Sequence, residues 1–127
     1  LYDRATIANE LGAHAFVSIH ANAHDDRTVE GIQVLYYPDD GSRGNYKFAT
    51  YMMDALTKGL DAANKGIIQR PNLVVTRETK MPAVLLELGF LTNSKEENLL
   101  NTDSYRTLAA EAILDGLIKY FDKEILK

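Results

Sequence analysis

Two short apolar stretches, Val17-Ser18-Ile19-His20-Ala21-Asn22 and Met81-Pro82-Ala83-Val84-Leu85-Leu86-Glu87-Leu88-Gly89-Phe90, decide the fold of this chain. Each has the composition of a β-strand, and each carries one chemically active side chain, His20 in the first and Glu87 in the second. A polar group within such a stretch is costly to bury without a partner. A metal-ligating imidazole with a carboxylate close to it would explain why both residues are there.

Each of the two residues also has a structural explanation when taken alone. His20 would then be a hydrogen-bonded, partly buried histidine, and Glu87 would form a buried ion pair with Arg77 or Arg4. Both residues lie near the carboxyl ends of their strands, and ligands of open α/β sheets bind beyond those ends. If the two strands are parallel and close, the side chains meet at one cleft, and the balance shifts toward a functional site.

Composition narrows the function classes before any motif is considered. The 127 residues suffice for one domain with a core, and 14 basic against 18 acidic residues give a net charge of −4. No block of Lys or Arg indicates binding to nucleic acid. The absence of cysteine excludes disulfides, thiolate zinc sites and cysteine nucleophiles. No apolar stretch approaches the roughly 20 residues that a membrane span needs.

The periodicity of apolar residues predicts strands that alternate with helices. We expect strands at 15–20, 31–37, 73–76 and 83–88, and helices at 2–11, at 43–63, from Ser94 with a Ser94-x-x-Glu97 capping box, and from Tyr105 to Phe121. This alternation predicts a single α/β domain over residues 1–127, with a mostly parallel twisted sheet and helices on both faces.

Two further residues are candidates for binding a substrate. Asn22 follows His20 closely and either bonds a substrate amide or serves as a turn residue. Arg77 ends the expected strand at 73–76, where it either binds a substrate carboxylate or pairs with Glu87 or Glu78. His24 has a ligand-like spacing from His20, but its polar surroundings favour a solvated loop.

Three blocks of the sequence carry a family resemblance. Ser18-Ile19-His20-Ala21-Asn22, the stretch from Met81 to Asn93, and the ending from Gly116 to Phe121 resemble the zinc-dependent N-acetylmuramoyl-L-alanine amidases of the type-3 class. These bacterial and phage enzymes cut the amide between the lactyl group of muramic acid and L-alanine in peptidoglycan. The resemblance implies a peptidoglycan hydrolase, and it extends from the first helix to about Phe121.

The resemblance assigns roles to individual residues. His20 matches the last zinc-ligating His of the family, Glu87 matches its catalytic Glu, and Arg77 matches a recurring Arg to which, like Asn22, we assign substrate binding. The family's other zinc ligands, a His and a Glu, come before the segment at which this chain begins. The resemblance therefore implies the C-terminal two-thirds of a catalytic domain, with one or more N-terminal strands and two metal ligands missing.

The resemblance also sets expectations for cofactor, partners and location. We expect zinc as cofactor, a muropeptide or peptidoglycan substrate, and action of an autolysin type at the bacterial cell wall, with signal and wall-binding regions outside this chain. Because missing strands would expose sheet edges, we expect dimerisation, partial disorder near Leu1, or strand exchange. Two alternatives remain: a non-catalytic muropeptide-binding or regulatory module of the same fold, and another α/β metallopeptidase.

Overall fold

The computed structural model describes residues 2–127, so the expectation for Leu1 lies outside the described residues. Its elements are α1 (Tyr2–Glu10), β1 (Phe16–Asn22), β2 (Ile32–Tyr36), α2 (Asn45–Leu60), β3 (Asn64–Gln69), α3 (Val74–Arg77), β4 (Ala83–Phe90), α4 (Ser94–Leu100), α5 (Asp103–Tyr120) and the π-helical turn η1 (Phe121–Ile125). Among these helices, none has both the length and the apolar composition needed to cross a bilayer.

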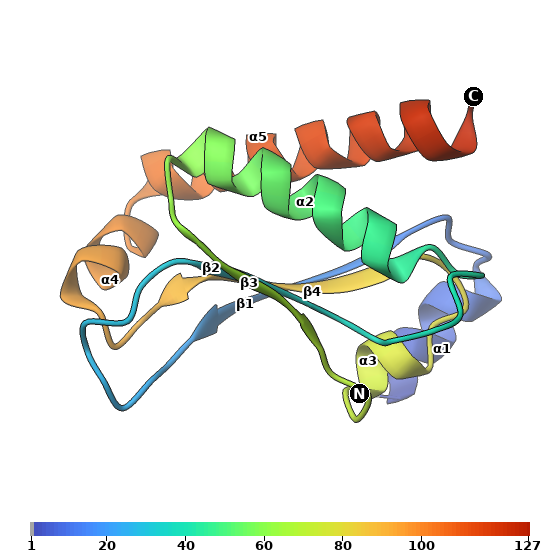
Figure 1. Cartoon of the computed structure of the whole chain (residues 1–127), viewed down its shortest axis with the longest axis horizontal. Helices are drawn as coiled ribbons and strands as arrows, with labels where there is room; N and C mark the ends of the chain where they lie inside the picture. The colour runs from blue at the N-terminus through green and yellow to red at the C-terminus, as the bar shows by residue number, and fades with distance from the viewer. Residues whose placement is uncertain (1) are drawn as a thin grey trace.

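The four strands form one twisted sheet in the order β1-β4-β2-β3 (Figure 1). The outer pairs, β1 with β4 and β2 with β3, are parallel, whereas β2 and β4 in the middle are antiparallel. The prediction of a mostly parallel α/β sheet is therefore confirmed. Strands β1 and β3 form the two edges among the described residues, and dimerisation through such an edge stays a prediction.

Helices α2 and α5 cover one face of the sheet and form the main core there (Figure 1). The apolar positions of α2 recur at helical spacing, so Phe48, Met52 and Leu56 point to one side and are fully buried. They belong to the same cluster as Val34 and Leu86 from the two central strands. This layer fixes which side chains of the sheet point inward and which point to the opposite face.

The opposite face is covered at one end by α3 and α1 (Figure 1). Val75 of α3 forms a smaller buried cluster with Leu35 and Leu85 of the central strands. This cluster lies toward the start of β4. At the other end, where β1 and β4 finish, the same face carries the polar residues considered below. Helices thus lie on both faces, as the sequence predicts.

The expected strand at 73–76 is wrong, and the true third strand is β3. Val74-Val75-Thr76 has the β-branched composition of a strand, but the amides of Arg77 and Glu78 donate to the carbonyls of Leu73 and Val74 at 2.8 and 2.9 Å and close a helical turn. Burial of Val75 against the sheet outweighs its intrinsic preference. The periodicity of apolar residues does not predict strand β3, because its sequence, Asn-Lys-Gly-Ile-Ile-Gln, is too polar to show a strand pattern.

The contact between α2 and α5 depends on small residues. A Cβ atom added at Gly59 would lie 2.8 Å from the Cβ atom of Ala112, and one added at Gly116 would lie 2.7 Å from the sulfur of Met52. The first contact leaves no flexible side chain to move aside. Close approach of the helix backbones therefore requires glycine at position 59.

We expect Gly59→Ala to destabilise the fold by about 1–3 kcal/mol through overpacking, although alanine favours helix by about 1 kcal/mol over glycine. Urea denaturation monitored by circular dichroism measures the change. Lys58→Ala is the matched control, because this exposed neighbour makes only a surface ion pair with Asp54, and its effect should stay below about 1 kcal/mol. A Gly59→Ala midpoint equal to or above that of the wild type would contradict the tight contact.

Candidate functional site

The parallel pairing of β1 and β4 brings His20 and Glu87 together. They are register partners in the ladder, so their side chains point to the same face of the sheet, away from α2 and α5. Directly after this pair the register shifts, and Asn22 pairs with Phe90. Such irregularities re-aim side chains and end regular pairing, and they are frequent beside active sites. The two strands are thus parallel and adjacent, which is the part of the predicted arrangement that places the two strand-end residues side by side.

The Glu87 carboxylate is only partly satisfied. Its Oε2 atom is buried, and among residues 2–127 it is the only buried side-chain oxygen or nitrogen without a hydrogen-bond partner. Within this part of the chain, Glu87 forms neither of the expected ion pairs with Arg77 or Arg4. Burial raises the pKa of Glu87, and the charge of nearby His20 acts in the opposite direction. A carboxylate with a raised pKa is suited to accept and return a proton.

The His20 ring is exposed and held from one side. Its Nε2 atom lies 3.1 Å from Oγ of Ser18, which is buried two residues earlier on the same face of β1. When Nε2–H donates to this hydroxyl, Nδ1 keeps the lone pair that a metal ligand needs. The structural alternative is thus correct about the hydrogen bond but wrong about burial, because the ring faces solvent.

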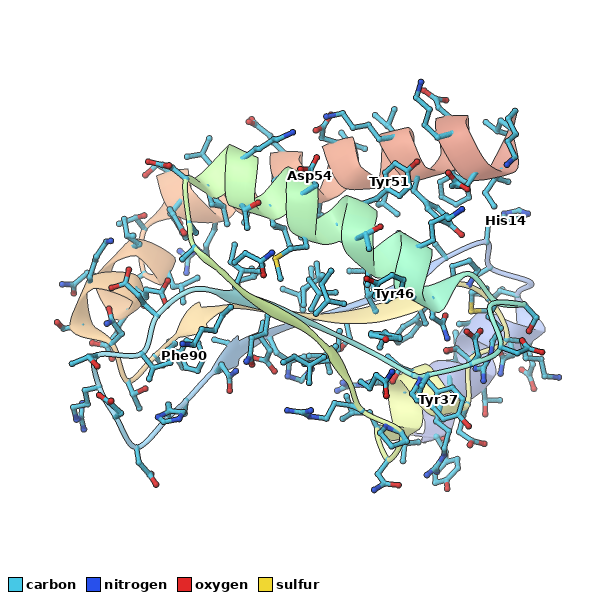
Figure 2. The ribbon with its side chains drawn as sticks, in the orientation of Figure 1. His14, Tyr37, Tyr46, Tyr51, Asp54 and Phe90 are labelled. Atoms are coloured by element: carbon cyan, nitrogen blue, oxygen red, sulfur yellow. The ribbon has the colours of Figure 1, made fainter. Side chains whose placement is uncertain are left out.

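A cleft of about 430 Å³ at the end of the sheet is lined by Glu87 but not by His20. Its lining residues come only from strands and loops: Asn22, Ala23, His24, Val29, Gln33, Leu35, Lys65, Arg70, Glu87 and Phe90. Figure 2 shows Phe90 at the end of the sheet near α4, and Tyr37 and Tyr46 toward the other end. A larger hollow of about 600 Å³ is lined by Tyr46 and Tyr120, and it contains neither His20 nor Glu87.

Comparison with known proteins identifies the family. The family model described as N-acetylmuramoyl-L-alanine amidase matches residues 1–119. The chain belongs to the N-acetylmuramoyl-L-alanine amidase family. The resemblance seen in the sequence is thereby confirmed.

Relatives and solved structures of this amidase family agree with the match. The chain is 36% identical over 107 residues to the probable cell wall amidase LytH of Staphylococcus epidermidis. This match covers 84% of this chain and 35% of LytH. The N-acetylmuramoyl-L-alanine amidase of Clostridium difficile 630 superposes with a TM-score of 0.90 at 34% identity, covering 96% of this chain and 65% of that one. The catalytic domain of CwlV from Bacillus (Paenibacillus) polymyxa gives a TM-score of 0.84 at 36% identity, covering 93% and 63%.

The donor set of this amidase chain does not by itself fit a zinc ion. A catalytic zinc takes three protein ligands and keeps a fourth position open. Residues 2–127 hold no group of three or more His, Asp or Glu side chains that could bind a metal. They offer one suitably placed imidazole, that of His20, and an adjacent carboxylate. Further ligands would have to come from outside these residues.

Arg77 and Asn22 lie in different places. Arg77 belongs to α3, where its guanidinium donates to Glu78 at 2.8 Å and to the Tyr2 hydroxyl at 3.1 Å. Of the partners weighed for it, Glu78 is the one observed. Asn22 lines the cleft, where its amide donates to Oε1 of Gln33 at 2.8 Å, and its Oδ1 atom accepts from the following amide, as in a turn.

Sequence reasoning missed several residues of the cleft. Gln33 pairs with Glu87 across the antiparallel strands, whereas Lys65 lies within β3, the strand that was not predicted, and Arg70 follows its end. His24 was expected to be merely solvated; it is exposed, but its ring also lines the cleft, edge-on to Phe90 at 6.4 Å. The alternation of side chains along β2 could have placed Gln33 on the same face as Leu35. Lys65 and Arg70 could be assigned to the cleft only if β3 was known to be the third strand.

A second buried carboxylate, that of Glu96, does not line the cleft but bonds to the backbone beside it. Its oxygens accept hydrogen bonds from the backbone amide of Gly31 at 3.1 Å and from that of Phe90 at 2.8 Å. It thereby ties the start of β2 to the end of β4. Helix α4 begins at Ser94 as predicted, but the cap is Asn93, whose side chain accepts from the Glu96 amide, and not the expected Ser94-x-x-Glu97 box.

We expect Glu96→Gln to lower the free energy of unfolding by about 1.5–3 kcal/mol, because an amide nitrogen replaces one of the two oxygens that accept from the Gly31 amide, and the negative charge facing two backbone donors is lost. Chemical denaturation measures this loss, and hydrogen exchange at Gly31 and Phe90 should accelerate. Glu97→Gln provides the control, since this neighbouring side chain is exposed. Equal stability of the two variants would show that the Glu96 contacts contribute nothing.

Proposed function

We propose that this chain is the part of a peptidoglycan amidase domain that carries its acid–base residue. The reaction is hydrolysis of the amide between N-acetylmuramic acid and L-alanine. One observation carries the proposal: Glu87, which lines a cleft and has an unpartnered buried oxygen, is the register neighbour of His20. By analogy with the relatives named cell wall amidases, we place its action at the cell wall, as an autolysin.

In this proposal Glu87 moves the proton. It takes a proton from the attacking water and then passes it to the leaving nitrogen of L-alanine, and its raised pKa suits both steps. His20 would serve as one ligand of a zinc ion. Zinc, when bound, would supply polarisation of the scissile carbonyl and acidification of water.

The substrate-binding roles proposed from the sequence have unequal support. Asn22 lies in the cleft beside Gln33, and its amide is placed to bond a substrate carbonyl once it leaves Gln33. Arg77 is held by Glu78 and Tyr2, and its backbone carbonyl accepts from Arg43. These contacts favour a supporting role for Arg77 over direct contact with the substrate.

In the full-length protein we expect Glu87→Gln to reduce kcat for cleavage of muramoyl-L-alanine by about 10²–10⁴-fold, because the glutamine cannot exchange a proton. Release of the new amino terminus of L-alanine measures the rate. Glu111→Gln, an exposed carboxylate on α5, should retain the wild-type rate. A Glu87→Gln enzyme that keeps a near-wild-type rate would remove Glu87 from the mechanism.

The second candidate function is a muropeptide-binding or regulatory module that hydrolyses nothing. It is favoured by the absence, within residues 2–127, of a group of three metal-ligating side chains. In this case the cleft would hold the muropeptide without turnover. The two candidates differ in what zinc does to the chain.

Calorimetric titration of the chain with zinc separates the two candidates. Because a single imidazole is available, we expect weak binding to residues 2–127, which His20→Ala should abolish, and much tighter one-to-one binding to the full-length protein. His14→Ala is the control, since this exposed ring precedes β1. Full-length protein that binds muropeptide, but that neither binds zinc nor hydrolyses the muropeptide, would establish the binding module.

A further inference from the structure

Two cations form one side of the cleft. Lys65 near the start of β3 and Arg70 just after its end both line the cleft that Glu87 also lines, and we call them the cationic wall. Within residues 2–127 neither residue takes part in an ion pair. The Arg70 backbone is held by the hydrogen bond that its N–H donates to the Tyr36 carbonyl at 2.9 Å.

The two members of the wall are not equivalent. Hydrogen bonds from Thr28 lower the pKa of the Asp26 carboxyl most, and the charge of Lys65 adds a smaller contribution, so Lys65 already has an acidic neighbour. Arg70 makes one side-chain hydrogen bond, from Nη1 to the adjacent Gln69 carbonyl at 3.0 Å. Its guanidinium therefore keeps further N–H donors for a ligand, in the planar arrangement that matches a carboxylate.

The other lining residues include both polar and apolar side chains. Asn22 and Gln33 are neutral and polar, whereas Val29 and Phe90 are apolar. The chain as a whole is acidic, with a net charge of −4, so its overall field does not attract anions. An anionic group that enters this cleft is stabilised by the wall itself.

Substrate chemistry indicates which anion would be bound. The lactyl carboxyl of muramic acid is consumed in the scissile amide, so the remaining carboxylates of a muropeptide lie on its peptide. Glu87 and the cationic wall line the same cleft of about 430 Å³, so a stem peptide that occupies this cleft lies against the wall.

We propose that Arg70, assisted by Lys65, binds a carboxylate of the stem peptide and makes the site selective for muropeptides with free carboxylates over their carboxamides. This inference rests on the proposed function and names a specificity determinant for it. Arg70 touches the substrate away from the reacting atoms, so it sets affinity and not the chemical step.

Binding tests this inference without turnover. The chain, with no zinc added, is titrated by calorimetry with two muropeptides that differ only in carrying carboxylates or carboxamides on the peptide. We expect the carboxylate form to bind about ten-fold more tightly, as for one charge-assisted contact at an open site. Raising the salt concentration should narrow this difference.

Matched variants assign the preference to a residue. Arg70→Gln should bind both muropeptides with the same affinity, Arg70→Lys should retain part of the preference, and Lys65→Gln should lose less of it than Arg70→Gln. Arg106→Gln on α5, whose partner is Asp103, should bind like the wild type. Circular dichroism melting of each variant verifies that it folds.

The inference and the proposed function fail in different ways. An unchanged preference in Arg70→Gln, equal binding of both muropeptides by the wild type, or binding of neither would overturn the role of Arg70. Full-length protein that prefers the carboxylate form but cuts neither muropeptide would overturn the proposed hydrolysis and support the role of Arg70 in binding.

Discussion

The register of β1 against β4 is the constraint on which the site depends. Because side chains alternate along a strand, a slip by one residue would turn His20 toward α2 and α5 and separate it from Glu87. Packing of Val17 of β1 against the core on the helix-covered face opposes such a slip. Backbone bonds beyond the ladder, from Phe16 to Pro82 at 2.9 Å and from Leu91 to Asn22 at 2.8 Å, fix it at both ends.

The sequence predicts those elements whose burial pattern is strong. The spacing of Phe48, Met52 and Leu56 specifies a helix, and β4, which is apolar on both faces except at Glu87, has the composition of a central strand. The pairing of His20 with Glu87 requires only that two strands, each with its residue near the carboxyl end, lie parallel and adjacent. These features are local, or they depend on a single long-range pairing.

The cationic side of the cleft lies beyond what local patterns can predict. At the edge of the sheet, β3 is partly exposed and needs few apolar residues, so Asn64-Lys65-Gly66 has no strand signal. Val74-Val75-Thr76 carries such a signal, yet forms a helical turn because that geometry buries Val75 against Leu35 and Leu85. Tertiary packing sets the conformation of both segments, and the position of Lys65 and Arg70 at the cleft depends on it.

Two carboxylates at the same end of the sheet show how structure separates support from chemistry. Glu96 is fully enclosed, and backbone amides from two segments bond its oxygens, so its charge is balanced by fixed dipoles. Glu87 lies at the cleft with one buried oxygen left unbonded and its pKa raised by burial. A protein gains no stability from leaving that oxygen without a partner, because desolvation of a polar atom costs free energy. The unbonded oxygen of Glu87, beside an exposed imidazole that Ser18 orients, is therefore the feature of this sheet that stability alone does not explain.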